Sequence, residues 1–123
     1  MFSMYLISGV IGVMLFFSIA VAPAIFKVLP AEWAGIYVRQ FFPKYYLVLG
    51  IVCVEAGIFA PTTQLKIICY ISAALFAISL WVLTPAINKA KDENKTQRFN
   101  WLHGASVVIN LVILGLLFLS FWL

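Results

Sequence analysis

Four long stretches of apolar residues limit what this chain can fold into. They cover about 3–26, 45–64, 67–87 and 99–123. An α-helix rises 1.5 Å per residue, so about 20 residues cross the roughly 30 Å hydrocarbon core of a bilayer. Backbone polar groups inside lipid must pair within their own segment, which favours helices over open strands. The pattern therefore predicts an all-α integral membrane protein, a four-helix bundle.

The composition excludes a soluble domain. Of the 123 residues, 65% are hydrophobic and 10% are charged, whereas soluble domains carry about 25% charged residues. A chain of this size buries only about 60–70% of its surface, so much apolar surface must face lipid. The net charge of +4 does not indicate a nucleic-acid partner, because the basic residues lie in short connections and form no basic stripe. The first stretch lacks a basic start and a cleavage site, so we expect it to be retained as a span.

The segment 30–42 is expected to form a short amphipathic helix lying in the membrane interface. Pro30 suits the first turn of a helix, and apolar residues recur at the spacing of one helix face. Pro43 is expected to end this helix and to open the second span. The residues predicted to lie at the interface are Arg39, Pro43, Tyr45 and Arg98.

The basic residues predict the orientation of the chain. The first and third connections together carry seven Lys and Arg residues, and the second carries only Lys66. Because Lys and Arg favour the cytoplasmic side, both termini are expected to face away from the cytoplasm, in a bacterial inner membrane. Tyr45 and Tyr46 are interpreted as part of an aromatic belt that anchors the cytoplasmic boundary.

Glu55 is the clearest polar candidate within the spans. It follows Lys44 by eleven residues, or about 16 Å of helix, which predicts a position near the bilayer centre. The carboxyl is expected to be neutral at pH 7, because burial disfavours the charged form and no basic partner lies within the spans. Two interpretations stay open: a neutral group hydrogen-bonded between helices, or a site for a proton, cation or substrate.

Three polar residues of the fourth span, His103, Ser106 and Asn110, share the i, i+3, i+7 spacing of one helix face. We expect that face to point into the bundle, with Asn110 at a depth where it can pair with Glu55. One interpretation is hydrogen bonding between helices. The other is a functional centre, because the unperturbed pKa of histidine lies near neutrality.

Pro23 and Pro85 are predicted to kink the first and third spans. Each proline frees a backbone carbonyl one turn before it, which serves packing or lines a polar vestibule between His103 and Glu55. The chain has one histidine, no nucleophile elbow and no Gly-rich phosphate loop, so an enzyme is not expected. Cys53 and Cys69 form no Cys-x-x-Cys pair and are interpreted as packed thiols, with no metal site expected.

Several fragments match a known pattern: Phe26 to Pro30, Phe42-Pro43-Lys44-Tyr45-Tyr46, Leu83-Thr84-Pro85, and His103-Gly104-x-Ser106 with Asn110. With these fragments the chain resembles the TMEM205-like proteins, the DUF4149 family of small four-helix membrane proteins. The resemblance implies a fold and a topology, but no activity. The chain departs from animal members in its short third connection, 88–98, and in Thr84, where an acidic residue can stand.

Three functions are compatible with these observations. The first is a transporter or channel-like protein for a small solute or cation, which needs a homo-oligomer because four spans are few for transport by one chain. The second is an accessory or scaffold subunit of a larger membrane complex. The third is a redox protein that binds haem b through His103, its only histidine.

Overall fold

The computed structural model describes residues 2–123 and confirms the all-α four-helix prediction. These residues form helices and short connections, with no β-strand among them. The four long helical rods are Phe2–Val28, Ala31–Phe59, Thr63–Asp92 and Thr96–Trp122, and each is long and apolar enough to cross a membrane. The rods are made of these elements: α1 (Phe2–Phe16), η1 (Phe17–Val21), α2 (Ala22–Val28), α3 (Ala31–Phe59), α4 (Thr63–Ile78), η2 (Ser79–Leu83), α5 (Thr84–Asp92), α6 (Thr96–Leu119) and η3 (Ser120–Trp122).

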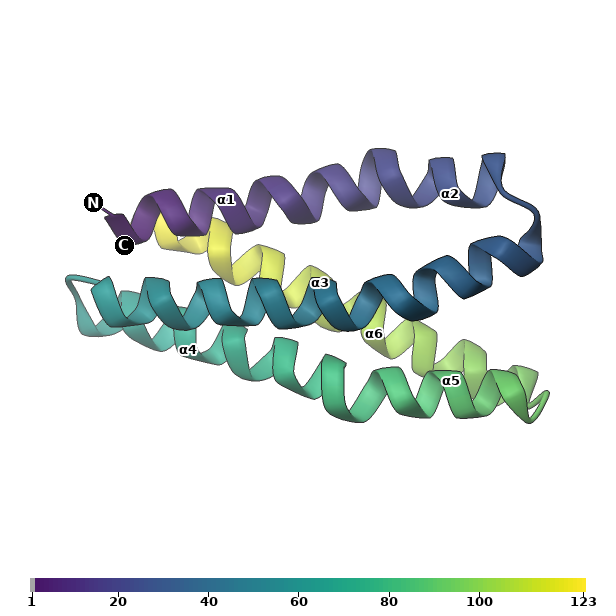
Figure 1. The fold of residues 1–123 in the computed structure, drawn as a ribbon. Helices are drawn as coiled ribbons and strands as arrows, with labels where there is room; N and C mark the ends of the chain where they lie inside the picture. The colour runs from purple at the N-terminus through teal and green to yellow at the C-terminus, as the bar shows by residue number, and fades with distance from the viewer. Residues whose placement is uncertain (1) are drawn as a thin grey trace.

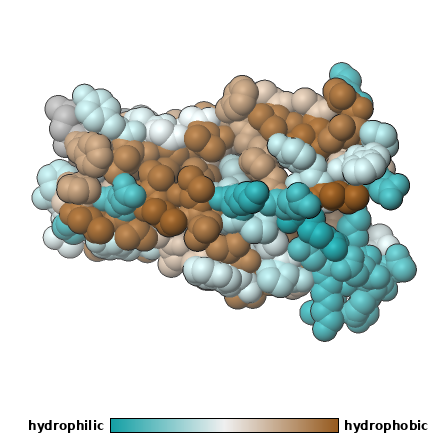
Figure 2. Space-filling model, in the orientation of Figure 1, coloured by the Kyte–Doolittle hydropathy of each residue, from teal (hydrophilic) through white to brown (hydrophobic). Residues whose placement is uncertain are grey.

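The rods run up and down in sequence order (Figure 1). Rod α3 packs against α1 and α4, and α6 packs against α1, α4 and α5, so α3 and α6 are diagonal members of the bundle. Both termini and the α3–α4 connection lie at one end, and the α2–α3 and α5–α6 connections lie at the other (Figure 1). Hydrophilic residues gather around the α5–α6 connection, whereas most of the face in view is hydrophobic (Figure 2). The first and third connections therefore share one side, as the sequence predicted.

The predicted interfacial helix over 30–42 is wrong as a separate element. Helix α3 runs unbroken from Ala31 to Phe59 with Pro43 inside it. Proline costs a helix one hydrogen bond, here from position 43 to the carbonyl of Arg39, and membrane helices tolerate that loss when neighbouring groups compensate it. At 1.5 Å per residue α3 is about 43 Å long, longer than the roughly 30 Å hydrocarbon core, so part of it must extend beyond that core.

The end of the second rod also differs from the prediction. The expected span reached residue 64, but α3 ends at Phe59 and a short turn containing Pro61 follows. The Thr62 hydroxyl caps the next helix by accepting a hydrogen bond from the Leu65 N–H, 3.2 Å away. A threonine N-cap favours the start of a helix. The boundary between the second and third rods therefore lies closer to Glu55 than the sequence predicted.

The two predicted kink prolines share one backbone arrangement. Each follows a five-residue π-helical segment, η1 before Pro23 and η2 before Pro85, with one residue between. The N–H of Ala22 bonds the carbonyl of Phe17, and the N–H of Thr84 bonds that of Ser79, five residues back in both cases. A π turn shifts the hydrogen-bond register. The helix can therefore continue although each proline lacks a backbone N–H donor. The Thr84 hydroxyl also donates to the Ser79 carbonyl at 2.7 Å.

The core lies where α3 meets its neighbours. Gly57 lets α3 approach α4 closely, because a Cβ built on it would lie 2.7 Å from the Tyr70 ring. At the other end of α3, Phe17 of η1 stacks on Phe41, with ring centroids 4.8 Å apart. Small residues and stacked aromatic rings thus bring the helices together, as expected where the hydrophobic effect does not drive association within lipid.

Candidate functional site

Glu55 lies on the outer surface of α3, not inside the bundle. Its side chain is exposed, and its neighbours on that surface, Ile51, Ile58 and Phe59, are at least half exposed. Glu55 is four residues from the end of α3 at Phe59, or about 6 Å along the axis. The structure therefore places Glu55 near the end of α3 that lies beside the termini, while its predicted depth in the bilayer stays a prediction.

Lys66 contacts the end of the helix that carries Glu55. Its ammonium donates hydrogen bonds to the carbonyls of Gly57 and Ile58, at 3.0 and 3.2 Å. These carbonyls belong to the last turn of α3, whose C-terminus attracts positive charge. Lys66 therefore closes the end of the helix that carries Glu55.

His103 is exposed on α6, so the prediction that it points into the bundle is wrong. Its ring stacks on that of Phe99, one turn earlier, with centroids 6.0 Å apart and planes 5° from parallel. The buried positions of α6 are Ser106, Ile113 and Leu117, and His103 falls at the edge of their stripe. The large apolar side chains determine the rotation of the helix, and that rotation buries only part of the predicted polar face.

Ser106 and Asn110 do face the bundle. The Asn110 amide nitrogen donates to the Tyr46 hydroxyl at 3.3 Å and to the Ser106 carbonyl at 2.9 Å. The Ser106 hydroxyl donates to the His103 carbonyl at 2.7 Å. We call the contact between α3 and α6 the Tyr46–Asn110 pair. Asn110 therefore bonds Tyr46 and not Glu55, the partner that the sequence suggested.

Tyr45 and Tyr46 are buried, with exposed fractions of 7% and 5%, so their rings pack against neighbouring helices, while their predicted position at the membrane interface stays a prediction. Tyr46 stacks against Phe42, one turn earlier, with centroids 5.7 Å apart. The ring centroid of Tyr45 lies 5.0 Å from that of Phe17 of the first rod. The signal in the sequence was the i, i+3, i+4 spacing of these aromatic residues, which indicates a shared helix face turned toward neighbouring helices.

The interior retains polar atoms with no protein partner among residues 2–123. They are the hydroxyls of Ser3, Ser72 and Ser79 and the amide oxygen of Asn110. Buried polar atoms usually find a partner, so these atoms offer hydrogen bonds to water or a small polar species.

Cys53 and Cys69 are buried free thiols. Within the described residues, no three His, Cys, Asp or Glu side chains gather as metal ligands.

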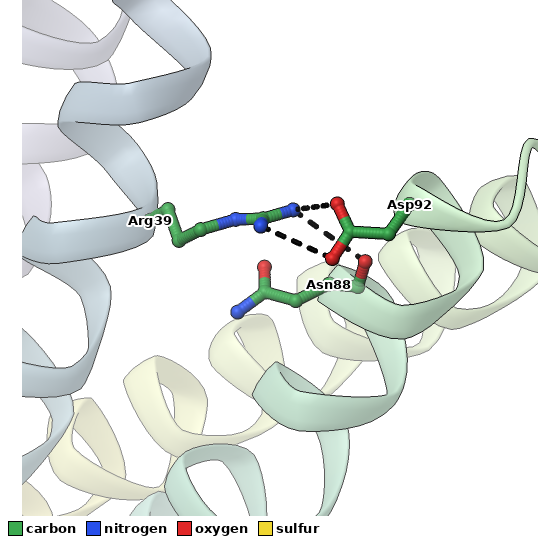
Figure 3. Close-up of polar contacts among 3 residues, drawn as sticks. All are labelled: Arg39, Asn88 and Asp92. Atoms are coloured by element: carbon green, nitrogen blue, oxygen red, sulfur yellow. Dashed lines mark hydrogen bonds and ion pairs between the residues drawn. The ribbon is translucent and has the colours of Figure 1, made fainter.

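An ion pair connects two rods at the end opposite the termini (Figure 3). The Arg39 guanidinium donates to both carboxylate oxygens of Asp92, at 2.8 and 3.2 Å, and also approaches the Asn88 carbonyl at 3.5 Å. Both side chains are exposed, and exposed ion pairs contribute little stability. Arg39, predicted at the interface, thus joins α3 to α5, while Arg98 is exposed near the start of α6.

The Tyr46–Asn110 pair predicts coupled effects on stability. Tyr46→Phe and Asn110→Leu should each lower the free energy of unfolding, and the double variant should lose less than the sum. The expected coupling is about 0.6 kcal/mol, the average for hydrogen bonds between membrane helices. Tyr45→Phe is the matched control, because its hydroxyl makes no hydrogen bond to Asn110. A double-mutant cycle from denaturant unfolding in detergent measures the coupling, and strictly additive Tyr46 and Asn110 effects would contradict the pair.

The comparisons with known proteins identify a family. Residues 5–123 match the family model described as a domain of unknown function, DUF4149. A protein of Aquifex aeolicus (strain VF5), described as uncharacterized, is 34% identical over 112 residues, which cover 89% of this chain and 83% of that protein. No solved structure matches the chain. Since the family model spans nearly all of the sequence, the chain belongs to the DUF4149 family.

Proposed function

We propose that the protein assembles into a homo-oligomer in the membrane and passes a proton or small cation along the contact between protomers. The observation that carries this proposal is the exposed carboxyl of Glu55 in an otherwise apolar surface. An ionisable group that faces lipid is costly and is usually paired with protein or water. A second protomer against α3 would remove the carboxyl from lipid and supply its partner.

The position of His103 supports a head-to-tail arrangement. Glu55 and His103 are exposed on α3 and α6, which are diagonal in the bundle, so their outer surfaces face in different directions. A contact between the α3 surface of one protomer and the α6 surface of the next uses two different patches, and such contacts close into a ring where the rotation from one protomer to the next closes. Glu55 lies near the end that carries the termini and His103 near the opposite end, so together they would line two depths of one contact.

The chemistry of these two groups favours a proton or a small cation. A carboxyl and an imidazole each bind and release a proton, and both accept hydrogen bonds from hydrated cations. Among residues 2–123, the unpaired buried groups of the bundle are three hydroxyls and one amide oxygen. A path between protomers therefore explains the exposed ionisable groups better than a path through one chain.

The decisive experiment measures assembly and flux on the same preparation. Native mass spectrometry of protein in lipid nanodiscs should give a closed oligomer. Liposomes loaded with K⁺ and a pH-sensitive dye, and made K⁺-permeable with valinomycin, should take up protons faster with protein than without it. A strictly monomeric protein with background flux would contradict the proposal.

An accessory role in a larger complex is the alternative. The same Glu55 surface would then meet a different membrane protein, and the small size and short connections of the chain suit a packing subunit. Purification in mild detergent would retain the partner, and the purified chain would show no flux.

We also propose a bacterial inner-membrane location and a TMEM205-like relationship, supported by the bacterial relative and the family match. Haem b at His103 is the third candidate, tested by a Soret band after haem-sufficient expression.

A further inference from the structure

An apolar groove of about 560 Å³ lies between the first rod and α3. Gly9 and Gly12 form one wall, Tyr37 and Phe41 form the other, and Phe17 contributes to the lining. Phe17, Phe41 and Tyr37 are stacked in succession, with centroids 4.8 and 5.8 Å apart. The volume falls within the range of about 300–1,000 Å³ that is typical of ligand sites.

The two glycines keep the groove open. A Cβ built on Gly9 or Gly12 would meet no protein atom within 4 Å, so the space beside these positions belongs to the groove. The nearby lining residue Phe16 is 66% exposed, and both rods are of the kind that crosses a membrane. A groove on the outer surface of such helices opens onto hydrocarbon, so a linear apolar chain fits its shape and its surroundings.

Lys44 is not a lining residue of the groove but carries positive charge one turn after Phe41 on α3. It follows Phe41 by three residues and Tyr37 by seven, a spacing that places all three on one face of α3. Its side chain is exposed, and it makes no ion pair among residues 2–123. Arg39, the other basic residue within α3, is occupied by Asp92. A free cation next to an apolar groove complements a molecule with an anionic head and a hydrocarbon tail.

We infer that this groove binds one acyl chain of an anionic phospholipid, with the lipid phosphate held by Lys44. The stacked rings of Tyr37, Phe41 and Phe17 contact the first part of the chain, and Gly9 and Gly12 leave room for the remainder. This site is separate from the Glu55 surface and does not depend on the proposed transport.

The test uses full-length protein in nanodiscs that contain equal amounts of phosphatidylglycerol and phosphatidylcholine with identical acyl chains. Native mass spectrometry counts the lipids that each protein retains on release. Gly12→Leu places a side chain in the groove without a clash, and Gly115→Leu is its matched control, because a Cβ there also meets nothing within 4 Å. Lys44→Gln removes the charge, and Lys89→Gln is the control at another exposed lysine.

The wild-type protein and both controls should retain phosphatidylglycerol over phosphatidylcholine by about fivefold, the factor expected for one lysine at an anionic surface. Gly12→Leu should reduce the retention of both lipids several-fold with unchanged helix content by circular dichroism. Lys44→Gln should keep lipid but lose the preference. Unchanged retention in Gly12→Leu would overturn the site, and an unchanged preference in Lys44→Gln would overturn the role of the lysine. Loss of an oligomer in Gly12→Leu, with lipid retention intact, would assign the groove to a second copy of the chain and would also overturn the inference.

Discussion

A reporter enzyme that works only in the cytoplasm should give almost no signal when fused after Leu123. The same reporter inserted between Glu93 and Asn94, in the turn between α5 and α6, should give full signal. The structure places these two points at opposite ends of the bundle (Figure 1). The end with the α5–α6 turn belongs to connections that carry seven of the eight Lys and Arg residues, and the positive-inside rule assigns that end to the cytoplasm.

The paired fusions make the result independent of expression level. The turn is exposed on both sides of the insertion point, and such turns tolerate added sequence. A second reporter that is active only outside the cytoplasm should give the reverse pattern at the two points. A strong cytoplasmic signal from the fusion after Leu123, with none from the turn, would invert the topology and move Glu55 to the cytoplasmic side.

The number and type of the spans were predictable from the sequence because they depend on length and hydropathy. About 20 apolar residues can cross a bilayer only as a helix, whatever the neighbouring segments do. The helix boundaries were less predictable. Pro43 was expected to end a helix, as it would in water, but α3 continues through it. The Thr62 cap was visible in the sequence next to Pro61, and it would have corrected the end of the second span.

The direction of each polar side chain was the least predictable property. The cost of a polar group in lipid suggested that Glu55 and His103 point inward, yet both are exposed. The rotation of each helix is determined by the fit of its large side chains, such as Tyr45 and Tyr46 of α3, and not by one costly residue. A single chain can therefore leave an ionisable group on its surface.

The Tyr46–Asn110 pair shows why distant partners were missed. Asn110 was expected to need a hydrogen-bond partner in the bundle, and it has one, but the partner is 64 positions earlier in the chain. Tyr46 was interpreted from its position after Lys44, where an aromatic residue is typical of the interface. Its burial follows from the packing of α3 between α1 and α4. The spacing of the aromatic residues indicates a shared helix face but does not say which helices cover it.

Substitutions of Glu55 should separate assembly from transport and have the largest effect on function. Glu55→Gln keeps a neutral group that can donate and accept hydrogen bonds, so the oligomer should remain. It cannot release a proton, so proton uptake in liposomes should fall to the level of liposomes without protein. Glu55→Leu suits the lipid-facing surface of α3 and removes the hydrogen bond between protomers. In model helices, removal of such a hydrogen bond weakens the free energy of association by about 1–2 kcal/mol. Association of the Glu55→Leu protein should therefore weaken about 5- to 30-fold.

Glu32→Gln is the matched control, because it changes a glutamate in the first turn of the same helix, at the end opposite Glu55. This variant should retain the oligomer and the flux of the wild-type protein. Full proton uptake by Glu55→Gln would show that the carboxyl is not part of the transport path, even if the oligomer persists. A Glu55→Leu protein that assembles as tightly as the wild type would show that the exposed carboxyl does not hold protomers together, because a leucine facing lipid gives no comparable reason to associate. Loss of the oligomer in Glu55→Leu, with its retention in Glu55→Gln, is the combination that a hydrogen-bonded contact at α3 requires.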